Sequence, residues 1–217
     1  MNDRTVWKHP NDLTIEKKKK VMESIIFLSE KTYGAVKGLM CTNGSTQRSH
    51  IPREKASRPT VTTESVLMTR VIDAKQDIDV MSMDVPSAFV QTESPQGDER
   101  IIMKIRGALV DILLEIDPEK HKDFAIGEGR NKVPHARMLK SSHGMLMASI
   151  LCYNKFRENI EAEGYKVNPH DICVAKKITK GKQHALTWHV DDAKTSHVDS
   201  KVNDKFCKWA KKKHDSD

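Results

Sequence analysis

Three aspartates have the types and spacing that could hold catalytic metal ions. Asp84 lies near the end of a predicted strand, and the pair Asp191-Asp192 directly follows another. Neighbouring carboxylates repel each other unless a cation lies between them. Mg²⁺ prefers oxygen ligands, and two such ions about 3.5–4 Å apart can activate a hydroxyl and stabilise a leaving pyrophosphate. The simpler interpretation of the pair is a turn, where aspartate is common.

The segments around these aspartates alternate between apolar and polar side chains, which is typical of strands. Residues 79–85 and 185–190 both have this pattern. The second segment and residues 195–198 predict a hairpin with Asp191-Asp192 at its tight turn and Trp188 in the core. The first segment would be a neighbouring antiparallel strand, with its terminal carboxylate facing the same cleft.

The remaining sequence predicts helices and strands that follow one another irregularly. Helices are predicted over residues 12–31, 63–75, 107–117 and 146–163, and at the C-terminus, where Val202, Phe206 and Trp209 form a stripe. Further strands are predicted at residues 101–105 and 172–178. In the second helix, we expect Val66, Leu67, Val71 and Ala74 to face inward. The elements lack a strict βαβ rhythm, which favours an α+β fold.

The composition narrows the classes of function. The 217 residues suit one domain or two small ones, with 37% apolar and 31% charged residues. A net charge of +7 suits a polyanionic partner, because lysines release counterions from phosphates, but it also suits a merely soluble basic protein. Aromatic residues at 5% argue against a single-strand binder built on rows of stacking rings.

Cysteine usage and hydropathy indicate a compartment. The four cysteines form no C-x-x-C pair, which fits a reducing environment. No apolar run approaches the length of a membrane span, and the N-terminus lacks the apolar region of a signal peptide. We expect a soluble intracellular protein without a membrane partner.

Five segments together resemble the reverse transcriptases of copia-type retrotransposons. Residues 188–192, with 194–199 after them, resemble the x-V-D-D box of that family, and residues 83–89 are similar to its first carboxylate motif. Residues 139–144 look like a degraded form of its Leu-Tyr-Gly segment. The match in the fingers involves residues 37–38 and 43–48, and the match in the following helix runs from 59 to 74. They run in the family's order from about residue 12 to 210.

The resemblance implies the fingers and palm of a right-hand polymerase, with an antiparallel palm sheet packed on helices. It implies that Asp84, Asp191 and Asp192 hold two Mg²⁺ ions, with Mn²⁺ as a substitute. Three further residues would bind the nucleotide. Lys37 would meet the triphosphate, Phe89 would stack under the incoming sugar, and Gly144 would allow close backbone approach.

The family also implies an organisation and partners. Residues 1–11 would be loose, 12–78 fingers-like and 79–217 palm-like, with an insertion loop at about 118–134. The thumb and ribonuclease H regions expected downstream are missing from this chain. The implied activity is RNA-directed DNA synthesis on an RNA or DNA template-primer with deoxynucleoside triphosphates, in a cytoplasmic virus-like particle or the nucleus.

Several departures from the family pattern leave other interpretations open. Leu39 stands where relatives usually carry a triphosphate-clamping arginine, so a bidentate donor is lost. Other departures are Thr46, His143, Met147 and Ala193. The alternative is a catalytically dead retroelement remnant that binds nucleic acid weakly. A third interpretation is a mononuclear metal hydrolase built from His189, Asp191, Asp192, His197 and Asp199.

Overall fold

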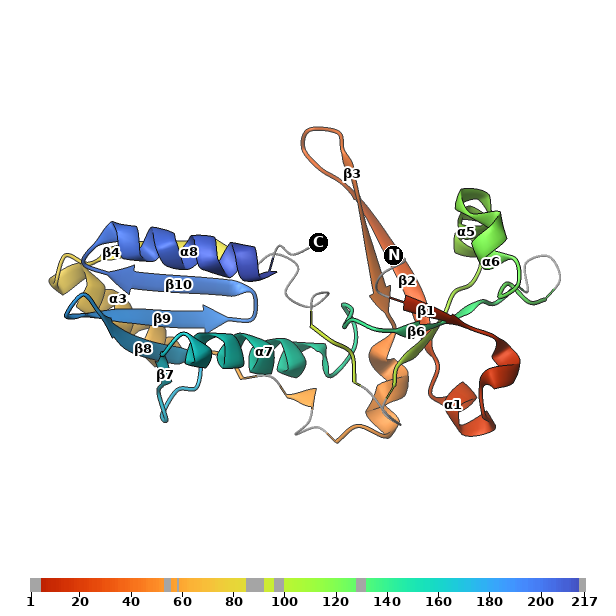
Figure 1. Cartoon of the computed structure of the whole chain (residues 1–217), viewed down its shortest axis with the longest axis horizontal. Coiled ribbons are helices and arrows are strands. Elements are labelled where there is room, and N and C mark those ends of the chain that lie inside the picture. Colours follow the sequence, from red (N-terminus) through yellow and green to blue (C-terminus); the bar gives the residue numbers. More distant parts are fainter. Residues whose placement is uncertain are drawn as a thin grey trace. The chain divides into compact units, whose positions relative to one another are not determined.

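The computed structural model describes residues 5–52, 56–57, 59–84, 92–95, 100–127 and 132–214. The chain forms two compact units, each assembled from two stretches (Figure 1). Unit 1 comprises Met1–Ala56 and Thr92–Ala148, and unit 2 comprises Ser57–Gln91 and Ser149–Asp217. Helices and two mainly antiparallel sheets make a mixed fold, which is compatible with the α+β class.

Unit 1 is built around a five-stranded sheet. Its strand order is β1 (Thr5–Lys8), β6 (His135–Met138), β5 (Ile102–Lys104), β2 (Met22–Glu30) and β3 (Val36–Thr42). Only β2 and β5 pair in parallel. The α-helices are α1 (Ile15–Lys19), α5 (Ala108–Ile116) and α6 (Pro118–His121), and the 3-10 helices are η2 (Pro10–Asp12) and η3 (Gly44–Ser49). Buried Met22, Met103 and Ala136 lie at the centre of the sheet.

The helix predicted over residues 12–31 is wrong for most of its length. The Thr14 hydroxyl accepts a hydrogen bond from the Lys17 N–H at 3.3 Å, which starts α1, but the helix ends at Lys19. Residues 22–30 instead form β2 and pair in register with β3. Two adjacent isoleucines and a phenylalanine favour strand there, and the pairing with β3 outweighs the helical spacing of the apolar residues.

Parts of the predicted irregular segments are ordered. Residues 5–8 of the predicted loose segment form β1, which pairs with β6. The predicted insertion loop contains α6, and its His121 is buried with its ring 4.7 Å from that of Trp7. The side chain of Trp7 therefore holds part of this loop against β1.

Unit 2 is built around an entirely antiparallel sheet. Its strand order is β4 (Asp79–Asp84), β10 (Asp192–His197), β9 (Lys182–His189), β8 (Val174–Thr179) and β7 (Lys166–Val167). Its helices are α3 (Thr63–Lys75), α7 (Ala148–Ala162) and α8 (Ser200–His214). No helix in the described part of the chain is long and apolar enough to cross a membrane.

The two faces of this sheet differ in chemistry. One face packs against α7 and α8 (Figure 1), and the apolar core forms there. The members of this core include Phe156, Ile160, Leu186, Trp188, Ala193 and Phe206. The other face carries α3, whose contacts with the sheet are polar: Asp73 accepts from both Lys194 and Ser196.

The helix predicted over residues 63–75 is confirmed, but the predicted inward face is wrong for three of its four residues; Val66 is half-buried and lines a cleft beside the sheet. Leu67 and Val71 are more than half exposed, and Ala74 is also exposed, whereas Asp73 is buried. Buried hydrogen bonds and an ion pair with β10 set the rotation of α3 about its axis. Apolar patterning alone could not predict this orientation, because it assumes that apolar burial dominates.

Candidate active site

Asp84 and Asp192 lie directly opposite each other on neighbouring strands. Strand β4 ends at Asp84, β10 begins at Asp192, and the two residues are partners in the antiparallel register. Directly opposed residues have Cβ atoms about 4.5–5.5 Å apart and project from the same face of the sheet. The predicted pairing of these two antiparallel strands is confirmed, and it places the two carboxylates side by side.

A tight turn places Asp191 beside this pair. His189 of β9 pairs with Asp192 of β10, so Val190 and Asp191 alone form the connection. The predicted hairpin is therefore confirmed, although Asp192 is the first residue of β10 and Val190 belongs to the turn. Val190 has φ of 63°, a conformation that is unfavourable for a β-branched residue. Such strain costs on the order of 1–3 kcal/mol and clusters at functional sites.

The core anchors the hairpin from the opposite face. Trp188 is 2% exposed, and its ring packs edge-on against Phe156 at 5.4 Å and stacks with Tyr153 at 6.2 Å. Successive strand residues point to opposite faces, so a buried Trp188 directs His189 towards the face that carries the carboxylates. The hairpin that carries Asp191 and Asp192 is therefore anchored in the core through Trp188.

Asp84 and Asp192 line a cleft of about 380 Å³ within unit 2. One wall comes from the segment before α3 and its first turns. The other wall is the sheet. The polar side chains of the lining are Thr69, Arg70, Ser82, Asp84, Thr187, His189, Asp192 and Lys194. The cleft is thus large enough for a small ligand or part of a larger one.

Two buried contacts hold the α3 wall in place. The Lys194 ammonium pairs with Asp73 and also donates to the Thr69 hydroxyl at 3.0 Å. At the start of α3, the N–H and hydroxyl of Thr62 donate to one Asp171 oxygen at 2.9 and 3.0 Å. Burial by itself would raise the pKa of Asp171, but hydrogen bonds to its carboxylate outweigh this effect and lower it.

The ion pair between Lys194 and Asp73 reduces the positive charge that the lining of the cleft carries. Asp73 neutralises Lys194, so the lysine contributes little net charge to the lining. Arg70 remains as an exposed cation opposite two exposed carboxylates, Asp84 and Asp192. The described part of the chain contains no cluster of three or more histidine, cysteine, aspartate or glutamate side chains placed to hold a metal.

The residues of the predicted hydrolase cluster do not converge. His189 pairs with Asp192 at the start of β10, whereas His197 is the last residue of that strand. His197 is 1% exposed, and its ring accepts a hydrogen bond from the Asp199 N–H at 3.0 Å. Because His197 lies at the far end of β10 and is already hydrogen-bonded, the mononuclear hydrolase interpretation is wrong.

Two of the predicted nucleotide-binding residues, Lys37 and Gly144, belong to unit 1. Lys37 is exposed on β3 of unit 1, where it pairs with Ser29 in the β2–β3 hairpin. Gly144, also in unit 1, has φ of 88°, and a Cβ there would collide with the Thr42 carbonyl oxygen. The need for glycine at this position is thus explained by local packing. Phe89 lies outside the described residues.

Sequence reasoning missed four residues that shape the cleft: Arg70, Asp73, Asp171 and Lys194. The one available signal was the polar spacing of Thr69 and Asp73, which puts both on one side of α3. Asp171 and Lys194 gain their partners from segments far away in the chain, so no local pattern marks them.

Comparison with known proteins found no relative: no family model, curated protein or solved structure matches this chain.

Proposed function

We propose that this chain is the fingers and palm part of an RNA-directed DNA polymerase of the copia-retrotransposon type. The observation that supports this most is the in-register pairing of Asp84 with Asp192, with Asp191 in the adjoining turn. The proposal also rests on the resemblance of the two aspartate motifs. The reaction would be nucleotidyl transfer from a deoxynucleoside triphosphate to a primer 3′-hydroxyl on an RNA or DNA template.

In this proposal, the three aspartates would hold the metal. Asp84 and Asp192 would supply adjacent carboxylates from two strands. Asp191, in the turn, would supply a third only if its side chain moved towards them, because the three do not form a cluster in the described structure. Magnesium is commonly held by one or two carboxylates together with water and substrate phosphates, so this donor set suits it better than zinc. When bound, two Mg²⁺ or Mn²⁺ ions would activate the attacking hydroxyl and stabilise the leaving pyrophosphate.

The chain's own residues would orient the substrate. The cleft beside the carboxylates gives the nucleotide or the primer end a defined wall, which Lys194 and Asp73 keep in place. Arg70 lies in that lining and can meet a phosphate. The roles of Lys37, Phe89 and Gly144 at the nucleotide rest on the resemblance alone.

The alternative is a retroelement remnant that keeps the fold and binds nucleic acid weakly. One observation favours it: Leu39 occupies β3, opposite Phe27, where the family's clamp would be. A leucine cannot donate a hydrogen bond to a triphosphate. The chain could therefore keep its metal-binding residues and yet lack polymerase activity.

Metal binding separates these possibilities. We expect electron paramagnetic resonance to detect Mn²⁺ bound to the full chain, and an Asp84→Asn, Asp192→Asn double variant to lose it. Asp199→Asn is the control, because Asp199 pairs with Lys180 rather than with the site. Primer extension is measured on the same samples.

Mn²⁺ binding with primer extension, by the native chain or by a Leu39→Arg variant, supports the polymerase. Binding without extension by either protein supports the remnant. If Mn²⁺ does not bind, or binds equally to the double variant, the two-metal proposal is refuted.

A further inference from the structure

Unit 2 contains a second cavity, between α8 and strands β8 and β9. Its volume is about 230 Å³. Thr179 and Lys177 of β8 contribute to its lining, as does the buried His184 of β9, which pairs with Lys177 in the register. His184 projects to the same face as Leu186 and Trp188, whereas Asp192 projects to the other face. This cavity is therefore separate from the carboxylate cleft.

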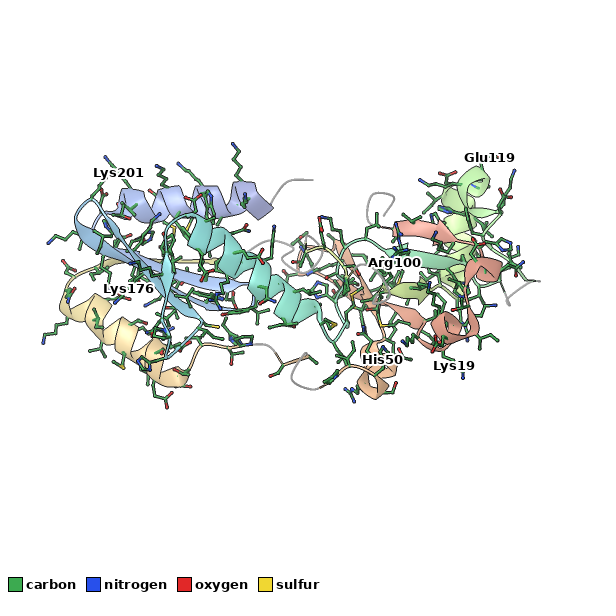
Figure 2. The ribbon with its side chains drawn as sticks, turned by 60° about the horizontal axis from the view of Figure 1, so that its bottom comes forward. Lys19, His50, Arg100, Glu119, Lys176 and Lys201 are labelled. Atoms are coloured by element: carbon green, nitrogen blue, oxygen red, sulfur yellow. The ribbon has the colours of Figure 1, made fainter. Side chains whose placement is uncertain are left out.

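The lining of this cavity is strongly basic. Four lysines contribute to it, from β8, from the β8–β9 turn and from α8: Lys177, Lys180, Lys201 and Lys205. Glu163 is the one acidic residue among the described lining residues. Lys201 lies in the first turn of α8 (Figure 2) and is four residues from Lys205, so both ammonium groups reach from one side of the helix. Two like charges at this spacing repel each other unless an anion compensates them.

The lysines differ in the ion pairs and hydrogen bonds that their ammonium groups already make. Lys180 pairs with Asp199 at 2.7 Å. Lys177 donates to the Glu163 carbonyl at 3.2 Å and lies 4.4 Å from the centre of the Tyr165 ring. Within the described residues, Lys201 and Lys205 have no side-chain hydrogen bond or ion pair. The charge of Lys201 nevertheless helps Lys180 to lower the pKa of Asp199, so Lys205 is the less engaged of the two.

One hydroxyl of the wall is sealed off from solvent. The Thr179 Oγ1 atom is inaccessible to solvent and has no hydrogen-bond partner among the described residues. A ligand in the cavity cannot reach an atom that solvent cannot reach, so recognition of an anion falls to the lysines.

The other polar groups of the wall are already satisfied. His184 contacts the Tyr165 hydroxyl through Nδ1 at 2.7 Å and the Thr195 hydroxyl through Nε2. Burial lowers the pKa of His184 to about 4, so this ring is neutral near pH 7. The positive charge of the cavity therefore comes from the lysines. Phe206 and Trp209, whose rings lie 5.4 Å apart, form an apolar wall.

We propose that this cavity binds a compact oligophosphate group, held by Lys201 and Lys205. Lysine acts as a point charge for phosphate, and the cavity is too small for a nucleic-acid duplex. The group could be a free inorganic oligophosphate or the triphosphate of a nucleotide. In both cases the phosphate chain is what the site recognises, and the site does not depend on Asp84, Asp191 or Asp192.

Calorimetric titration of the full chain tests this proposal. The probes are inorganic triphosphate, ATP and adenosine, in a low-salt buffer with a chelator that removes divalent ions from the aspartates. We expect triphosphate and ATP to bind and adenosine not to bind. A Lys201→Gln, Lys205→Gln variant should bind at least about tenfold more weakly, which corresponds to about 1.4 kcal/mol.

A matched control separates a site from general charge. Lys208→Gln, Lys212→Gln removes the same charge at the same spacing from exposed positions of α8 outside the cavity. Its affinity should stay within about twofold of the native chain, a difference of roughly 0.4 kcal/mol. Equal losses in both double variants, or no binding by the native chain, would overturn the proposal. Binding of ATP but not of inorganic triphosphate would also overturn it.

Discussion

At the scale of single residues, the ion pair between Lys194 and Asp73 matters most for the architecture of the cleft. Both side chains are largely buried, with 16% and 9% of their surface exposed. Ser196 donates to the same Asp73 oxygen at 3.0 Å. Because the apolar residues of α3 face outward, this polar cluster is the principal contact between the middle of α3 and the sheet.

We predict that Asp73→Asn destabilises the chain by about 3–5 kcal/mol, because it leaves the Lys194 ammonium buried without a counter-charge. Denaturant unfolding measures this change. Glu161→Gln is the control: it breaks the exposed pair with Arg157 and should cost less than about 1 kcal/mol. A loss of similar size in both variants would show that Lys194 is effectively solvated.

At the scale of elements, a chain of buried hydrogen bonds joins α8 and the Tyr165 hydroxyl to the sheet of unit 2. The Thr195 hydroxyl donates to the Asn203 side-chain oxygen at 3.0 Å, and the Asn203 amide donates to the Asp79 carbonyl and carboxylate at 2.9 and 2.7 Å. Since Thr195 donates to Asn203, it must accept from His184 Nε2, which sets the neutral tautomer. The Tyr165 hydroxyl then donates to Nδ1.

This network predicts a loss of stability in mild acid. The pKa of His184 is lowered to about 4 by burial and by nearby His197 and Lys177, whereas the unfolded chain titrates near 6.5. Between these values the unfolded state binds more protons, so the free energy of unfolding falls as the pH falls from about 6.5 to 4. One such group contributes up to about 1.4 kcal/mol per pH unit.

Urea unfolding across this pH range tests the prediction. His184→Gln should give a shallower pH dependence than the native chain, while His170→Gln, at an exposed site, should leave the slope unchanged. Parallel slopes in all three proteins would contradict a neutral, buried His184 in the folded state.

At the scale of the whole molecule, each unit is made from two stretches, so the chain passes between the units at three places: after residues 56, 91 and 148. The proposed catalytic aspartates belong to unit 2, whereas Lys37, Leu39 and Gly144 belong to unit 1. Activity of the proposed kind would therefore depend on both units.

We expect the native chain to extend a primer poorly, even with Mg²⁺ or Mn²⁺, because Leu39 cannot make a charge-assisted contact with a triphosphate. Without this contact the triphosphate is held less precisely, and misplacement of a reacting group by about 1 Å can cost on the order of 100-fold in rate. Leu39→Arg should raise the rate of extension, and Asp191→Asn should abolish it in both backgrounds. Robust synthesis by the native chain, lost in the Asp191→Asn control, would show that Leu39 is not the limiting defect.

The net charge of +7 leads to a separate prediction about polynucleotides. Binding should be weakly selective, and its affinity should fall by more than about tenfold between about 50 and 200 mM salt, because each lysine–phosphate contact releases counterions. Fluorescence anisotropy with a labelled duplex measures this slope. An affinity that hardly changes with salt would favour a soluble basic protein without a polyanionic partner.

The elements with strong local signals could be predicted from the sequence. The apolar spacing within residues 63–75 predicted the helix that became α3, and alternation around Asp84 and Trp188 predicted β4 and β9. The hairpin turn at Asp191 followed from the same alternation. These features depend on short-range spacing, which a single sequence displays directly.

How those elements are used depends on contacts between segments far apart in the chain. Residues 22–30 became a strand because β3 pairs with them, and Leu67 and Val71 of α3 face outward because Asp73 meets Lys194. The register that sets Asp84 opposite Asp192, and the lysines that line the second cavity, also join segments distant in the chain. Such contacts depend on the partner segment as much as on the residue itself, so the local pattern that defines an element does not define its neighbours.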